Sequence, residues 1–283
     1  MPVEAILPAY PLSWAWHDEV NMVPKQSRVR LLGVDIDPLR MSEAVDQILS
    51  WTRLRGGTCR YVVTPNVDHV VLLRHHVGLK AAYQNADLIL ADGTPVVWAA
   101  RLLRRPLPEK VPGSDLVPAI FDAVPAFQPR RVFLLGAGPG VAERAAERIR
   151  ERWPAVGIAG CYSPPMGFEK DAVENENILN RIAEASPDIL VVGLGAPKQE
   201  LWVHQNRQRI KAAAVLCVGA TIDFLAGEKP RAPVWMRRSG LEWLHRVWME
   251  PRRLAVRYAK GAWVFPQLVV RDWWRGGREP SLT

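Results

Sequence analysis

The sequence predicts an α/β protein: a mostly parallel sheet flanked by helices, followed by a basic helical C-terminal appendage. Short apolar runs rich in β-branched residues alternate about six times with helical patterns, which is typical of strands buried on both faces of a parallel sheet. Several of these runs end abruptly in glycine or proline, as in the Rossmann-like arrangement. The last part of the chain, residues 231–283, carries eleven lysines and arginines against four acidic residues, and six of the twelve tryptophans.

Composition limits the class of protein. The chain has 283 residues, of which 48% are hydrophobic, enough for a substantial core. Cys59, Cys161 and Cys217 are far apart and show neither metal-ligand spacing nor a disulfide framework, which favours a reducing cytosol. No run approaches the roughly 18 apolar residues of a membrane span. We expect a flexible leader without signal-peptide character, an α/β core and the appendage, at residues 1–28, 29–230 and 231–283.

The first predicted strand covers residues 29–34, and a helix follows from about Ser42 to Arg53. Between them, Asp35 and Asp37 form a D-x-D pair. In many sugar-transferring enzymes such a pair holds a metal ion bound to a diphosphate. A strand end followed by a proline-marked turn into a helix is the stronger interpretation here. We therefore expect no metal.

Polar residues follow the next two predicted strands, residues 60–63 and 86–91. The first strand ends in Thr64-Pro65-Asn66, and the second ends in Asp92-Gly93-Thr94-Pro95. If the strands are parallel, Thr64, Asn66 and Asp92 emerge at the carboxyl edge of the sheet, where α/β sheets bind ligands. A carboxylate beside a hydroxyl and an amide suits base catalysis and substrate positioning. Ordinary turn chemistry explains the same residues equally well.

Three strand ends in the second half of the core are marked by glycine. Each lets backbone N–H groups approach a phosphate at the start of the following helix. A nicotinamide site would also need an acidic residue at the end of the next strand, and residues 157–163 contain none. This disfavours an NAD-dependent oxidoreductase and leaves nucleotide binding open. The glycines are Gly136 and Gly138, Gly193 and Gly195, and Gly219.

Two basic segments remain. The proline-rich loop at residues 104–113 carries Arg104, Arg105 and Lys110, which suit a diphosphate or, equally, solvent. In residues 231–283, basic residues interleave with tryptophans, a pattern that suits an anionic membrane surface or single-stranded nucleic acid. A helix pair packed on the core with its arginines in solvent is the alternative.

Six motifs in sequence order resemble those of the WecG/TagA/CpsF glycosyltransferases, glycosyltransferase family 26. The similarity spans about residues 31–257. The motifs are TPN at 64–66, ADG at 91–93, VPGSDL at 111–116, GLGAPKQE at 193–200, FLAG and RAP within 224–233, and EWLHRVWMEPRR at 242–253.

This resemblance implies an inverting, metal-independent transfer of a hexose or N-acetylhexosamine-type sugar from a UDP-sugar, without a cofactor. The implied acceptor is a polyprenyl-diphosphate-linked saccharide at the inner leaflet of the bacterial cytoplasmic membrane, in cell-surface polysaccharide synthesis. It implies no nucleic-acid partner and leaves open whether the chain forms a homo-oligomer. A nucleotide-dependent oxidoreductase and a nucleic-acid-binding protein are the alternatives, in that order.

The resemblance also assigns roles to residues. Asp92 would be the base, with Thr64, Asn66 and Gln199 lining the catalytic site. Lys110 stands where the family usually has arginine; it keeps the charge but loses the bidentate fork. The UDP-sugar residues would be Gly136, Gly138, Gly193, Gly195, Lys198, Glu200, Gly219 and Asp223, the last facing the uracil. The acceptor diphosphate would meet Lys110, Arg246, Arg253 and Arg257.

Overall fold

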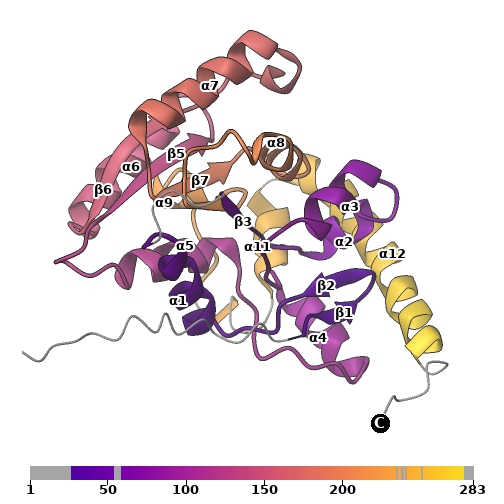
Figure 1. Cartoon of the computed structure of the whole chain (residues 1–283). Coiled ribbons are helices and arrows are strands. Elements are labelled where there is room, and N and C mark those ends of the chain that lie inside the picture. The colour runs from indigo at the N-terminus through magenta and orange to yellow at the C-terminus, as the bar shows by residue number, and fades with distance from the viewer. Residues whose placement is uncertain are drawn as a thin grey trace, which may run out of the picture.

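The computed structural model describes residues 27–53, 59–233, 235–236, 239, 241–249 and 251–276, without the side chains of residues 246, 251–258, 260, 275 and 276. Its centre is a six-stranded parallel sheet in the order β4-β3-β8-β7-β5-β6 (Figure 1). This confirms the predicted Rossmann-like α/β class. The strands are β3 (Arg60–Val63), β4 (Leu88–Ile89), β5 (Arg130–Gly136), β6 (Val156–Tyr162), β7 (Ile189–Gly193) and β8 (Ala214–Cys217).

The sheet separates two hydrophobic clusters. Alternate strand residues point to opposite faces, so Tyr61 and Val63 belong to one cluster and Val62 to the other. This two-sided burial explains why the strands read as continuous apolar runs. One face is covered by α1 (Met41–Trp51), α5 (Gly113–Asp122), α6 (Val141–Arg152) and α9 (Thr221–Leu225). The other is covered by α2 (Val67–Leu72), α3 (Val77–Gln84), α4 (Thr94–Leu102), α7 (Ala172–Ala185) and α8 (Lys198–Asn206).

The prediction for the first strand was wrong. Residues 29–34 do not form one strand but the start of an antiparallel hairpin, β1 (Val29–Leu31) and β2 (Val34–Ile36), in a separate two-stranded sheet. Leu32 and Gly33 at its turn have φ values of 53° and 84°. Positive φ at both central residues is the geometry of a tight two-residue hairpin turn. Because Leu32 is apolar, the turn was hidden inside an apolar run.

The basic appendage is helical, as predicted, and consists of α11 (Glu242–Met249) and α12 (Pro251–Gly276). Leu268 and Val269 of α12 are buried in the same cluster as α2 and α3, and the carboxylate of Asp272 accepts the N–H of Leu32 at 2.7 Å. The end of the appendage thus packs on the core beside the β1–β2 hairpin (Figure 1). Within the described ranges, we find no helix long and apolar enough to cross a membrane.

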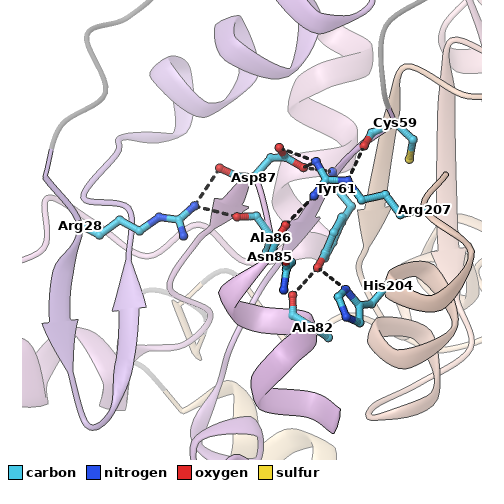
Figure 2. Close-up of polar contacts among 9 residues, drawn as sticks. All are labelled: Arg28, Cys59, Tyr61, Ala82, Asn85, Ala86, Asp87, His204 and Arg207. Carbon is cyan, nitrogen blue, oxygen red and sulfur yellow. Dashed lines mark hydrogen bonds and ion pairs between the residues drawn. The ribbon is translucent and has the colours of Figure 1, made fainter.

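A network of charged hydrogen bonds ties together the amino ends of β3 and β4 (Figure 2). Arg207, directly after α8, donates to both carboxylate oxygens of Asp87 at 2.9 and 2.8 Å, and Asp87 also accepts the N–H of Tyr61 at 2.9 Å. Arg28 donates to the carbonyls of Ala86 and Asp87 at 2.8 and 3.0 Å. These charged groups are all hydrogen-bonded within the protein, so at β3 and β4 the amino edge of the sheet has a structural role.

Candidate active site

A polar cavity of about 540 Å³ opens at the carboxyl edge of the sheet, where β3, β4, β7 and β8 end. The strand order makes β3, β8 and β7 neighbours, so residues from distant parts of the chain converge here. This is the position at which open α/β sheets bind ligands. Eight of the predicted site residues line it: Thr64, Asn66, Asp92, Gly193, Gly195, Gln199, Gly219 and Asp223.

Local structure places the side chains that follow β3 and β4. Asn66 is the N-cap of α2, and its side-chain oxygen accepts the N–H groups of Asp68 and His69 at 3.0 and 3.3 Å. Thr64 is buried, with its hydroxyl donating to the Cys217 carbonyl at 3.4 Å. The N–H of Asp92 donates to the Pro65 carbonyl at 2.9 Å. The two strand ends are thereby linked, and Asp92, Thr64 and Asn66 all line the same cavity.

The helix after Asp92 begins as the sequence predicted. Gly93 has φ 103°, a conformation that glycine adopts readily, and Pro95 lies in the first turn of α4. The chain therefore turns sharply at the rim of the cavity directly after the carboxylate.

Four predicted donor-site residues do not line the cavity. A Cβ on Gly136 would lie 2.6 Å from the carbonyl carbon of Gly193, so glycine is needed there for the close approach of β5 and β7. Gly138 accepts a hydrogen bond from Ser163 at 3.1 Å, and Lys198 lies 3.4 Å from Glu169. Glu200 is fully buried. The packing and contacts of these four residues give each of them a structural role. Their direct contact with a UDP-sugar donor stays a prediction.

A second, mostly apolar cavity of about 250 Å³ adjoins the polar one. The beginnings of α2 and α4 form one wall, and Trp243 of α11 and Phe265 of α12 form the other. Lys110 lines this apolar cavity and is absent from the lining of the polar one. Asn66, Asp68 and Asp92 line both. The predicted residues Arg246, Arg253 and Arg257 lie on α11 and α12, but their side chains are outside the described residues.

The charges around the polar cavity are mixed. The side chains of Asp223 and Lys229 both line it, 3.8 Å apart. Neither carboxylate of the D-x-D pair lines it: Asp35 pairs with Arg30 at 2.8 Å, and Asp37 pairs with Arg28 at 3.0 Å. In the part of the chain that the structure describes, no group of three or more His, Cys, Asp or Glu side chains is arranged to hold a metal ion.

The sequence reasoning missed His69, which lines the polar cavity and connects it to a buried polar cluster. His69 lies 3.3 Å from Glu200, which in turn accepts a hydrogen bond from Gln199 at 2.8 Å. Burial, with the neighbouring Glu200 carboxylate, raises the pKa of the Tyr83 hydroxyl well above its ordinary value. Burial does the same to the pKa of the Cys217 thiol. A histidine three residues after an N-cap asparagine was the only sequence signal for this cluster.

Comparison with known proteins identifies the family. A model described as "Glycosyl transferase WecG/TagA/CpsF family" matches residues 29–279. The chain belongs to this family. Among its relatives is an N-acetylglucosaminyldiphosphoundecaprenol N-acetyl-beta-D-mannosaminyltransferase of Staphylococcus aureus (strain MW2), 31% identical over 228 residues that cover 81% of this chain and 87% of the relative. The protein of the same name from strain NCTC 8325 / PS 47 is 30% identical over the same coverage.

Family motifs far apart in sequence meet at the rim of the cavity. Arg231 of the RAP motif donates to Ser114 at 3.3 Å and pairs with Asp115, both in the VPGSDL motif. A Cβ on Gly113 of the same motif would lie 2.7 Å from the Cβ of Val218, directly after β8. The glycosyltransferase motifs therefore build one site, because each contributes either a lining residue or a contact that holds the lining in place.

Proposed function

We propose that this glycosyltransferase moves a hexose or N-acetylhexosamine-type sugar, with inversion, from a UDP-sugar to a polyprenyl-diphosphate-linked saccharide in bacterial cell-surface polysaccharide synthesis. The observation that carries this proposal is the junction of the two cavities at Asp92 and Asn66. A polar cavity suits a nucleotide diphosphate sugar, and an apolar one suits a lipid-linked acceptor. The names of the relatives, which specify a diphosphoundecaprenol acceptor and an N-acetylmannosaminyl group, support the same division.

In this proposal Asp92 is the general base. An acceptor hydroxyl at the junction attacks C1 of the donor sugar and transfers its proton to the Asp92 carboxylate. The new C–O bond forms as the bond from C1 to the UDP oxygen breaks, and UDP leaves with both electrons. One carboxylate is sufficient for this chemistry.

The leaving group would be stabilised without a metal. In this proposal the backbone of the glycine turn at Gly193–Gly195 and the side chain of Lys229, both of which line the polar cavity, face the diphosphate. Preorganised N–H donors and a cation stabilise the charge that develops on the departing diphosphate. Asp223 lines the same cavity, and we propose that its carboxylate accepts a hydrogen bond from the uracil.

The acceptor implies contact with the inner leaflet of the membrane. Trp263, Trp273 and Trp274 of α12 are 75%, 62% and 63% exposed. Such amphipathic side chains are typical of the boundary between water and lipid, and nearby cations add about 1 kcal/mol each on an anionic surface. We propose that α12 lies on the membrane with the apolar cavity beside it, and that nucleic acid is not a partner.

The test is direct transfer. A panel of UDP-sugars is offered to the full chain with short polyprenyl-diphosphate-linked N-acetylglucosamine, and the products are measured by mass spectrometry. The proposal predicts a mass increase of one sugar residue for at least one donor, with release of UDP. Donor hydrolysis alone, or no product from any UDP-sugar in the panel, would contradict it.

A further inference from the structure

His69 and Glu200 form a buried connection between the two walls of the polar cavity. His69 lies in the first turn of α2 and is 7% exposed, and Glu200 lies in the first turn of α8 and is 0% exposed. His69 Nε2 is 3.3 Å from Glu200 Oε1, an ion-pair distance, although the angles do not make it a hydrogen bond. Among the described residues, His69 is the only basic side chain within ion-pair distance of Glu200.

The contacts of His69 fix the orientation of its ring. Its Nδ1 is 2.9 Å from Asn66 Oδ1 and 3.4 Å from the Asn66 backbone nitrogen. Because an amide oxygen only accepts, the shorter contact places a hydrogen on Nδ1. Nε2 faces Glu200 Oε1, so the imidazole ring lies between the Asn66 side chain and the Glu200 carboxylate.

This pair controls the orientation of two amides in the cavity wall. Asn66 Oδ1 receives the backbone N–H groups of Asp68 and His69 as well as His69 Nδ1–H, so the Asn66 NH₂ group must point the other way. Gln199 is 2% exposed; its Oε1 accepts the N–H of Gly219 at 3.1 Å, and its Nε2 donates to Glu200 Oε1 at 2.8 Å. Glu200 thus prevents the Gln199 amide from flipping.

We propose that Glu200 and His69 are positioning residues that fix the side chains of Asn66 and Gln199 in the cavity wall, with the Asn66 NH₂ group facing the cavity. A diphosphate offers only acceptors at neutral pH, so a fixed N–H donor matches it. Tyr83 and Cys217 also face Glu200, but burial keeps their hydroxyl and thiol protonated, and the Asp92 carboxylate acts electrostatically on Tyr83 as well. The identity of the ligand rests on the proposed function, whereas the orientation of the amides does not.

The first experiment needs no sugar transfer. In ¹H–¹⁵N NMR spectra of the full chain, we expect slowly exchanging side-chain amide signals from Asn66 and Gln199. In Glu200→Gln, the ring signals of His69 should shift, and both amide signals should shift and exchange faster. If the His69 and amide signals of the variant match those of the wild type, the positioning role is wrong, whatever reaction the enzyme catalyses.

Kinetics with a double variant separates positioning from stability. Glu200→Gln should lower kcat by about tenfold to a hundredfold, the cost of a misplaced site group, with little change in KM. His69→Gln should in addition lower Tm, because Glu200 is left buried without its partner. The double variant His69→Gln/Glu200→Gln should recover Tm but not kcat. Recovery of kcat along with Tm would show that the pair only stabilises the fold.

Discussion

The two ends of the parallel sheet use polar residues for opposite purposes. At the amino ends of β3 and β4, Asp87 receives two hydrogen bonds from Arg207 and one from the Tyr61 backbone (Figure 2). At the carboxyl ends of the same strands, Asn66 and Asp92 line a junction of two cavities. At the first edge the charged side chains are paired within the protein, whereas at the second they line the cavities in which we propose that the substrates bind.

This difference follows from the geometry of parallel sheets. Helices that follow each strand begin at the carboxyl edge, so their N-terminal N–H groups and cap residues gather there. The amino edge receives the ends of the preceding helices and loops, and here it is closed by an arginine placed directly after α8. Substitutions at the two edges should therefore affect different measured quantities.

The largest effect is expected at the carboxyl edge. Asp92→Asn keeps the shape of the side chain but removes the proposed base, so kcat should fall by about two to four orders of magnitude. UDP binding and Tm should change little, since Asp92 is only half-buried. Turnover of the purified variant and UDP titration by calorimetry measure both. Near-wild-type turnover would remove Asp92 from the mechanism.

The opposite result is expected at the amino edge. Asp87→Asn breaks a half-buried bidentate pair with Arg207, which should lower the free energy of unfolding by about 1–3 kcal/mol. The folded fraction should keep its kcat, because neither residue lines a cavity of the active site. Urea unfolding and turnover at 25 °C on the same preparation test this. A kcat loss larger than tenfold would mean that the two edges are coupled.

How far the sequence predicted each edge depends on the range of the contacts. Thr64, Asn66 and Asp92 were predicted because a strand end followed by proline or glycine is a local signal. The contact between His69 and Glu200 was not predicted. It requires β3 and β7 to lie on either side of β8, and the order of strands in a sheet cannot be predicted from local sequence. Gly136 shows a different limit of local sequence. From the sequence alone, this glycine was attributed to phosphate binding, but glycine is also required there because β5 packs closely on Gly193.

A smaller effect is expected where the appendage meets the proposed membrane surface. Trp273→Ala and Trp274→Ala should each weaken binding to vesicles that contain anionic lipid by about fivefold, corresponding to about 1 kcal/mol of partial burial. Phe127→Ala is the matched control, because Phe127 is an exposed aromatic residue in the loop before β5, at the amino edge. Sedimentation with vesicles at rising salt measures the affinity. Equal losses in all three variants would indicate nonspecific adsorption.

The smallest effect is expected from chelation. Both carboxylates of the D-x-D pair are engaged by arginines outside the polar cavity, and Asp37 also accepts the N–H of Ile89 at 2.7 Å. In the proposed mechanism, the backbone of the Gly193–Gly195 turn and Lys229 carry the diphosphate charge instead. We therefore expect the rate of UDP release to be unchanged in excess EDTA.

Asp35→Asn should be equally neutral for turnover, since it removes only an exposed pair with Arg30, worth about 0–1 kcal/mol. Two results together would show that the D-x-D pair holds a catalytic metal. Activity would be lost in EDTA and restored by magnesium or manganese, and it would also be lost in Asp35→Asn. The same metal dependence with full activity in Asp35→Asn would instead point to a metal carried by the donor diphosphate at the carboxyl edge.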